Sequence, residues 1–384
     1  MKEYMFYNPV KYLFGKGATE KIGTHAAALG KKALLVTYPG KPFDQFSERI
    51  QGLLADAGVE CVVFAKAEAN PMASTVREGA DFAFEQGCDL IIGLGGGSSM
   101  DTAKGIAFMT GKEGDIFDYI TAQRVGTTAL PIICITTTAG TGSEGNSTAV
   151  FTNDITLDKK GLVNPLIFPK VSIIDSDFMA TLPKHLIAGP GCDAFFHAFE
   201  SFISKDRHPI SEMLSLEAMR LSIQNLPKVY NDPTDYEAWD KVILANTLAG
   251  MAIGCAGTTI PHALGQPVSG LLNVAHSDSL VCMYPAFMKF TAHAAPEKFA
   301  ILAELLGCDL SGKTTEEAAE MSIEAMINFL KSINAYKKLS EFGVKEEHIE
   351  RLADGATNIM KVVLNKNPIV PTYEQVKQLY MESL

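Results

Sequence analysis

Four residues in the second half of the chain could together hold a divalent metal ion. Asp193 and His197 are four residues apart, a spacing that in a helix places both side chains on one face. His262 and His276 follow in a region with few other polar ligands. One carboxylate oxygen and three imidazole nitrogens favour Fe, Zn, Co or Ni over Mg or Ca, which prefer oxygen ligands.

The same spacing has a simpler explanation, because an Asp-x3-His pair also arises by chance as a solvated helix pair. The neighbours of His197 include two alanines and three phenylalanines, and a polar ring in such an apolar setting needs a partner. Pro267 and Gly270 lie between the other two histidines and argue against one unbroken helix there. We therefore expect His262 and His276 to come from two elements that converge on the Asp193/His197 face.

Composition predicts a globular protein of two domains. The chain has 384 residues, more than one average core accommodates. It is 47% hydrophobic and 20% charged, as folded proteins are. Its net charge of −11 argues against binding nucleic acid or an anionic membrane surface, both of which require clustered Lys and Arg.

The sequence favours a cytoplasmic location. The first residues show no apolar stretch or cleavage site of a secretory signal. No apolar run reaches the roughly 18 residues that a membrane span needs, so we expect no membrane association. The seven cysteines are odd in number and scattered, which indicates reduced thiols.

The two halves of the chain differ in their patterns. Residues 1–182 alternate apolar strand-like runs with helical ones, which predicts an α/β dinucleotide-binding domain with a mostly parallel, Rossmann-like sheet. The predicted strands are 32–37, 60–65, 89–94 and 130–136, and the predicted helices between them are 46–57 and 74–86. Residues 183–384 show long amphipathic helical stretches and almost no strand signal, which predicts an all-helical domain. Its predicted helices include 211–225, 236–252, 315–333 and 373–384.

Two glycine-rich loops follow strands of the first domain and predict a site for a dinucleotide. Residues 95–104, Gly-Gly-Gly-Ser-Ser-Met-Asp-Thr-Ala-Lys, run from a strand into a helix start, whose free N–H groups bind anions. Residues 136–144 again combine hydroxyls and glycines directly after a strand. Either loop alone could be an ordinary turn, and neither matches G-x-G-x-x-G or the P-loop. An acid at Asp101 could also simply complement the helix dipole.

These motifs together resemble the iron-dependent alcohol dehydrogenase family. The resemblance rests on Gly95–Lys104, on residues 137–144, on Gly-x-Asp-Ala-x-x-His-Ala-x-Glu at 191–200 and on the His262…His276 spacing. It extends from Asn8-Pro9 to Tyr380. It implies the fold of dehydroquinate synthase and iron-dependent alcohol dehydrogenases, with an active site in the cleft between the two domains.

The resemblance also implies roles for individual residues. The metal, Fe²⁺ or alternatively Zn²⁺, would be held by Asp193, His197, His262 and His276, which would act in catalysis through it. The residues expected to contact the dinucleotide, with Asp101 at the nicotinamide end and Asn70 near the adenosine, are Tyr38, Lys41, Asn70, Gly95, Gly96, Gly97, Ser98, Ser99, Asp101, Thr137, Thr138, Ser143 and Lys160. Lys160 could equally be a solvated loop cation.

Two positions depart from the family pattern. Many members carry a histidine four residues after the ligand at His262, as a candidate proton relay, and this chain has Gln266, which is no acid or base near neutral pH. NAD-preferring members tend to carry an Asp after the first strand, where it bonds the ribose 2′-hydroxyl. Here that place holds Tyr38 with Lys41 nearby, which gives a weak preference for NADP over NAD. Lys41 could also merely end a solvated loop.

We therefore expect a metal-dependent oxidoreductase that passes a hydride between NAD(P)(H) and a small primary alcohol, diol or aldehyde. The metal would act as a Lewis acid on the substrate oxygen. One alternative is a hydroxyacid–oxoacid transhydrogenase or a maleylacetate-type reductase, which would need a cation such as Lys205, Arg207 or His208 for the substrate carboxylate. Another is a non-catalytic nucleotide sensor. The resemblance further implies a homodimer or a higher homo-oligomer, formed through pairing of the segment Tyr4–Phe14 as a strand.

Overall fold

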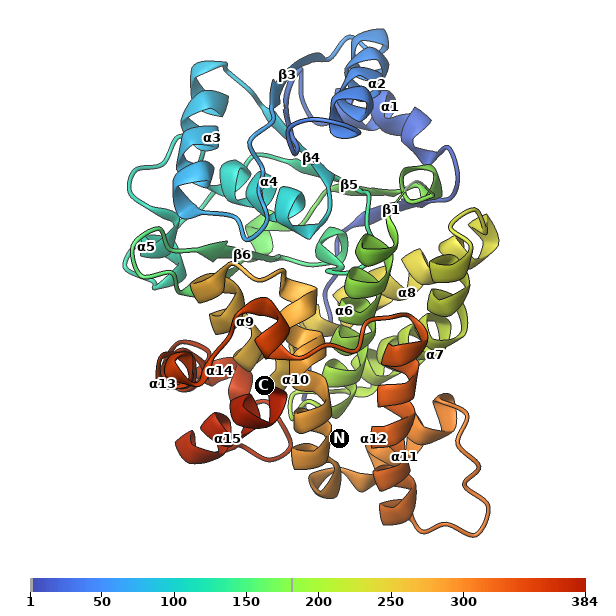
Figure 1. Cartoon of the computed structure of the whole chain (residues 1–384). Helices are drawn as coiled ribbons and strands as arrows, with labels where there is room; N and C mark the ends of the chain where they lie inside the picture. Colours follow the sequence, from blue (N-terminus) through green and yellow to red (C-terminus); the bar gives the residue numbers. More distant parts are fainter. Residues whose placement is uncertain (1–2, 181) are drawn as a thin grey trace. The chain divides into compact units, whose positions relative to one another are not determined.

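The computed structural model describes residues 3–180 and 182–384 and divides the chain into two compact units (Figure 1). The first unit spans residues 7–182. The second unit contains residues 183–384 together with the described residues before Tyr7. Residues 3–6 thus group with the helical unit, whereas the sequence analysis assigned them to the α/β domain.

Six parallel strands form the centre of the first unit, in the order β1-β8-β5-β4-β2-β3. Their bounds are β1 (Lys11–Phe14), β2 (Lys32–Val36), β3 (Glu60–Phe64), β4 (Leu90–Gly95), β5 (Ile132–Thr136) and β8 (Val171–Ile174). The four predicted strands correspond to β2, β3, β4 and β5, and the parallel sheet is confirmed. The short strands β1 and β8 were not assigned from sequence, because four residues give too little periodicity.

Helices cover both faces of this sheet, as its strands require. Along β2, Ala33 and Leu35 belong to the hydrophobic cluster with α1 (Ile22–Ala27) and α2 (Phe43–Asp56). Leu34 and Val36 belong to the cluster with α3 (Ala73–Glu85) and α4 (Gly97–Met109). Because successive side chains of a strand point to opposite faces, a continuous apolar run buries both.

Two further elements pack on the α3/α4 side. Helix α5 (Ile116–Ile120) contributes Ile116 to that core. The antiparallel hairpin of β6 (Thr148–Thr152) and β7 (Lys159–Val163) contributes Phe151 and Leu162. The sequence analysis assigned no strands to these residues, which follow the second glycine-rich loop.

The second unit is built from helices, and every strand assigned in the described residues lies before Asp175, so the predicted all-helical domain is confirmed. Its helices are α6 (Lys184–Ile203), α7 (Pro209–Asn231), α8 (Tyr236–Ala256), α9 (Ile260–Leu272), α10 (His276–Thr291), α11 (Pro296–Leu305), α12 (Thr315–Ser332), α13 (Ile349–Asp354), α14 (Lys361–Leu364) and α15 (Tyr373–Ser383). Among the described residues no single helix is long and apolar enough to cross a membrane, and only the pair α8 and α9, bent by 101°, meets length and composition together.

Helices α9 and α10 carry His262 and His276 separately, as predicted, but the expected reason for the break was wrong. Helix α9 continues through Pro267 and Gly270 to Leu272. The chain leaves the helix at Asn273, whose φ of 52° lies in the left-handed region. A proline inside a helix removes one donor. Here the ring packs closely against Gly355, where a Cβ would lie 3.0 Å from Cβ and Cγ of Pro267.

A buried carboxylate links the edge strand β1 to its neighbour β8 at the carboxyl ends of both strands. Asp175, which directly follows β8, is wholly buried. Its Oδ1 accepts from the backbone N–H groups of Gly17 (3.0 Å) and Asp177 (3.2 Å), and its Oδ2 accepts from that of Thr19 (3.1 Å). The short turn after β1 therefore depends on a single side chain from the neighbouring strand.

We expect Asp175→Asn to lower the free energy of unfolding by about 2–3 kcal/mol, because an amide nitrogen then faces a buried backbone donor. Chemical denaturation monitored by circular dichroism measures the change. The control is Asp177→Asn, which removes only an exposed ion pair with Lys16 and should change stability by about 0–1 kcal/mol. Equal effects of the two substitutions would contradict the role given to Asp175.

Candidate metal and nucleotide sites

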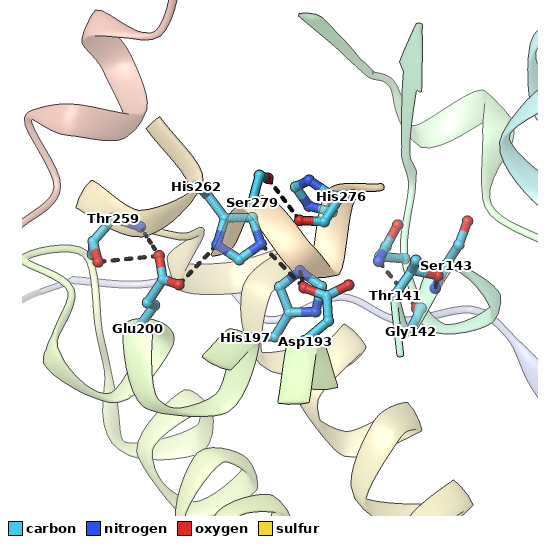
Figure 2. Close-up of polar contacts among 11 residues, drawn as sticks. Thr141, Gly142, Ser143, Asp193, His197, Glu200, Thr259, His262, His276 and Ser279 are labelled. Carbon is cyan, nitrogen blue, oxygen red and sulfur yellow. Dashed lines mark hydrogen bonds and ion pairs between the residues drawn. The ribbon is translucent and has the colours of Figure 1, made fainter. Parts of the chain in front are cut away.

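The four residues proposed as metal ligands gather inside the helical unit. Helix α6 places Asp193 and His197 on one face, and helices α9 and α10 add His262 and His276 (Figure 2). The first three side chains are 95% or more buried. Asp193, His262 and His276 each offer one ligand atom, and these three atoms all lie within 4.8 Å of one another. His197 lies beside Asp193 but is not part of that closest group.

The separations in this cluster suit a shared cation better than direct hydrogen bonds. Asp193 Oδ1 lies 3.5 Å from His262 Nε2 and 3.6 Å from His197 Nε2. Protein hydrogen bonds of this kind have heavy-atom distances of roughly 2.7–3.2 Å. Two ligands of one tetrahedral ion, each about 2.1 Å from it, are separated by about 3.4 Å. Asp193 Oδ1 and His262 Nε2 are both buried without a hydrogen-bond partner among the described residues.

The charges of the cluster favour a cation next to Asp193. Burial by itself raises the pKa of Asp193, but the imidazoles of His197, His262 and His276 outweigh it and hold the pKa below its usual range. Burial by itself lowers the pKa of His262, but the carboxylates of Glu200 and Asp193 outweigh it and raise this pKa to about 9. Asp193 is therefore held as the carboxylate, the form that ligates a metal, and the His262 ring carries the compensating positive charge. A metal ion bound here would displace the proton from His262 Nε2 and take over that charge.

One residue of this cluster had no role in the sequence analysis. Glu200, also on α6, is wholly buried, and its Oε1 lies 2.8 Å from Nδ1 of His262 (Figure 2). In the sequence it was only the last residue of the motif at 191–200, seven residues after Asp193 and so two helical turns along the same face.

Gln266, at the position of the candidate relay residue, is 92% buried on α9. It lies one turn after His262 and therefore on the same face of the helix. Its Oε1 has no hydrogen-bond partner among the described residues. A buried amide at this place can accept or donate a hydrogen bond but cannot take up a proton near neutral pH.

In the first unit, the predicted anion site at the start of α4 has the expected backbone. The helix begins at Gly97, directly after β4, and no side chain caps it. Its first N–H groups therefore remain available for an anion. A Cβ at Gly96 would lie 2.9 Å from Thr138 Oγ1, and one at Gly97 would lie 2.2 Å from Thr141 Cγ2. The glycines thus also let the two loops pack directly against each other.

Three of the predicted nucleotide-binding side chains make their hydrogen bonds inside the fold. Ser99 is wholly buried, and its hydroxyl lies 2.9 Å from the carbonyl of Leu94 and 3.1 Å from that of Val36. The hydroxyl of Ser143 donates to Oδ1 of Asp101 at 2.7 Å. Oδ2 of Asp101 accepts from the backbone N–H of Val150 at 2.8 Å. These side chains order the loops, and Ser99 can serve a phosphate only through its backbone N–H.

A buried lysine to which the sequence analysis assigned no role of its own joins helix α4 to the second loop. Lys104 on α4 is wholly buried. Its Nζ lies 2.6 Å from the carbonyl oxygen of Ser143, 3.0 Å from that of Asn146 and 2.9 Å from that of Thr148. Burial lowers the pKa of Lys104, and the carboxylate of Asp101 opposes that shift. An ammonium with several carbonyl partners holds the second loop in place against α4.

Three further residues predicted to contact the dinucleotide differ in how exposed they are: Tyr38, Lys41 and Thr137. The ring of Tyr38, two residues after β2, lies so close to Gly95 that a Cβ there would be 3.1 Å from Cε2. Lys41 is exposed. Thr137 is buried, and its hydroxyl has no hydrogen-bond partner among the described residues.

Asn70 and Lys160 lie near the hairpin but are not equivalent. Asn70 is buried with a φ of 54°, and its Oδ1 accepts from Nζ of Lys159 at 2.8 Å. Lys159 is also buried, whereas Lys160, the residue chosen from sequence, is partly exposed. The buried lysine of this hairpin is therefore Lys159, and Lys160, which was predicted to contact the dinucleotide, is the more exposed of the two.

We expect Lys104→Met to weaken dinucleotide binding and to lower the free energy of unfolding by about 3 kcal/mol, because carbonyl groups of the second loop lose their buried donor. Calorimetric titration with NAD⁺ and NADP⁺ and chemical denaturation measure the two effects. Lys112→Met is the control, since Lys112 bonds Thr128 outside both loops. Unchanged dinucleotide affinity in a destabilised Lys104→Met protein would show that the loop does not need this lysine to bind nucleotide.

Comparisons with known proteins identify the family from both halves of the chain. Residues 9–176 match a family model described as iron-containing alcohol dehydrogenase, and residues 187–384 match one described as the C-terminal part of the Fe-containing alcohol dehydrogenase family. NAD-dependent methanol dehydrogenase of Bacillus methanolicus is 34% identical over 380 residues, which cover 99% of each chain. 1,3-Propanediol dehydrogenase of Citrobacter freundii is 35% identical over 346 residues, or 89% of each chain.

Solved structures agree with these relatives. An archaeal halo-thermophilic alcohol dehydrogenase from a Red Sea brine pool superposes with a TM-score of 0.96 at 33% identity, covering all of both chains. This confirms the resemblance seen in the motifs and the two-part fold. The chain belongs to the iron-containing alcohol dehydrogenase family, a family of oxidoreductases.

Proposed function

We propose that this protein is a metal-dependent dehydrogenase that interconverts a small primary alcohol or diol and its aldehyde with a nicotinamide dinucleotide. The observation that carries the proposal is the pair of buried candidate ligand atoms in the helical unit, Asp193 Oδ1 and His262 Nε2. They lie 3.5 Å apart without a hydrogen-bond partner among the described residues. Such groups are costly to bury unless a cation satisfies them.

The donor set fits Fe²⁺, with Zn²⁺ as an alternative. Asp193, His197, His262 and His276 offer one oxygen and three nitrogens, which leaves a bound divalent ion with a net positive charge. When bound, such an ion acts as a Lewis acid on the oxygen of an alcohol or aldehyde. The residues' own part is to hold the ligand atoms in place and to keep the surrounding core dry, which strengthens that electrostatic effect.

The residues of the first unit would bind the dinucleotide. The free N–H groups at the start of α4 favour the pyrophosphate, and the buried hydroxyl of Thr137 is a further donor near that loop. When bound, the dinucleotide supplies the carbon that accepts or donates the hydride. Tyr38 and the hairpin lysines are proposed as further contacts.

We propose NAD as the dinucleotide. The weak preference for NADP rested on Tyr38 and Lys41, and the exposed side chain of Lys41 gives it no structural support. The relative from Bacillus methanolicus is named as NAD-dependent. Parallel assays with NADH and NADPH test this choice directly, and a higher kcat/KM with NADPH would overturn it.

The proposed substrates are small and uncharged. The relatives named above act on methanol and 1,3-propanediol by their names. The cations that a carboxylated substrate would need lie beyond the end of α6, which continues roughly 9 Å past His197. Arg207 pairs with Glu212 at 3.1 Å, and Lys205 donates to the carbonyl of Asn365 at 3.3 Å. Faster reduction of 2-oxoacids or maleylacetate than of short aldehydes would favour the transhydrogenase or maleylacetate-type reductase instead.

Protein purified without oxygen is expected to contain iron and to oxidise NADH with short aldehydes. In His276→Ala we expect metal affinity to fall by roughly 100-fold or more, beyond the 10–100-fold typical of outer-shell residues, with turnover lost in parallel. Elemental analysis and initial rates measure both.

The matched control is His293→Ala, which removes an exposed histidine and should leave metal content and turnover unchanged. Full activity of a metal-free His276→Ala protein would refute the metal-dependent reaction. A non-catalytic nucleotide sensor would instead bind NAD⁺ with no turnover in any substrate assay.

We further propose that the chain forms a homodimer through the free edge of its sheet. Strand β1 is an edge strand, and its Lys11 amide donates to the β8 side at 3.2 Å, so the N–H groups of Tyr12 and Phe14 point away from the sheet. Phe14 and Tyr7 are 46% and 61% exposed. An apolar edge of this kind pairs readily with a second copy.

Phe14→Lys places a charge on that edge and is expected to convert dimers into monomers without changing the helical content, because edge charges oppose strand pairing. Light scattering coupled to size exclusion measures the mass. Val163→Lys, a substitution of an exposed apolar residue of β7, is the control. A Phe14→Lys protein that stays dimeric would place the interface elsewhere.

A further inference from the structure

The carboxylate of Glu200 is buried, and each of its two oxygens has a different partner. Oε2 accepts from the backbone N–H of Thr259 at 2.7 Å and from its hydroxyl at 3.2 Å. Oε1 lies 2.8 Å from Nδ1 of His262. Among the described residues the structure assigns this side chain no Lys or Arg partner. A wholly buried carboxylate without a cationic side chain is costly unless another positive group compensates it.

Its surroundings fix the direction of this carboxylate. Thr259 directly precedes α9 and donates with both its N–H and its hydroxyl, so Oε2 faces the start of that helix. The positive end of a helix dipole stabilises a carboxylate there. Oε1 then faces the His262 ring (Figure 2). One side chain of α6 thereby links the helix of Asp193 and His197 to the helix of His262.

We infer that Glu200 is a positioning residue that fixes the tautomer and orientation of His262 for metal binding. A carboxylate oxygen at 2.8 Å only accepts, so Nδ1 must carry the proton. In the neutral ring that ligates a metal this is the only ring proton, so the lone pair is on Nε2, the atom that faces Asp193 Oδ1. A carboxylate that holds the other ring nitrogen also makes a histidine a better metal donor. The inference rests on the proposed metal site.

Glu200→Gln tests this role with almost no change in shape. The amide has a single oxygen, and the two donors of Thr259 compete for it with His262. When that oxygen faces Thr259, the amide nitrogen donates to Nδ1 and moves the ring proton to Nε2, where it blocks the metal. We expect the dissociation constant of Zn²⁺, measured with apoprotein by chelator competition, to rise about 10–100-fold. The melting temperature of the apoprotein should change little.

Two further variants make the outcome decisive. Glu217→Gln, on the surface of α7 in a pair with Arg220, should bind Zn²⁺ like the unaltered protein. Glu200→Asp keeps the charge but withdraws the carboxylate from His262, and its Zn²⁺ affinity should lie between those of the unaltered protein and Glu200→Gln. It also decides the question if Glu200→Gln does not fold.

The results separate this inference from the proposed function. If the unaltered protein and Glu217→Gln bind no Zn²⁺, Fe²⁺ or Co²⁺, the metal-dependent function itself fails. If they bind metal and both Glu200 variants bind it equally well, the positioning role is overturned. A fall in apoprotein melting temperature with unchanged metal affinity would overturn it as well, because it would show that Glu200 only links two helices.

Discussion

Two buried polar atoms without a hydrogen-bond partner among the described residues, Asp193 Oδ1 and His262 Nε2, set the main constraint on the helical unit. The Asp193 oxygen and the facing nitrogen of His262 lie 3.5 Å apart, too far for a good hydrogen bond. Such groups are costly to bury in an apolar core unless a hydrogen bond or a cation compensates them. Three helices from distant parts of the chain, α6, α9 and α10, therefore have to present their polar side chains at one point.

The α/β unit satisfies a comparable constraint in another way. Its two glycine-rich loops must leave backbone N–H groups open and still keep one shape. The open groups lie at the start of α4, which no side chain caps. Asp101 and Lys104 of the same helix fix the shape of the second loop, because they form hydrogen bonds with its polar groups and with the start of β6. Buried charges that are fully hydrogen-bonded make a loop rigid.

Most elements of the fold could be predicted from sequence, and the elements and boundaries that were missed have physical causes. Strands β2, β4 and β5 were found because continuous apolar runs buried on both faces leave a clear pattern. The edge strand β3 is only partly buried but still carries an apolar run. Strands β1 and β8 are too short to leave such a pattern. The break between α9 and α10 was expected from Pro267 and Gly270, yet α9 continues through both and ends before Asn273. A proline in a helix loses one hydrogen bond, which close packing of its ring can offset.

By itself the sequence determined the family, the parallel sheet, the helical second half and the residue types able to hold a metal, because periodicity and motif order are local properties of the chain. Only the tertiary structure decided which polar atoms remain free. The hydroxyls of Ser99 and Ser143 are used inside the fold, and Lys104 and Glu200, which had no assigned role, hold the loops and the His262 ring. The partner of a buried polar group comes from a segment that is distant in sequence and reaches it only after folding. Spacing along the chain therefore cannot predict that partner.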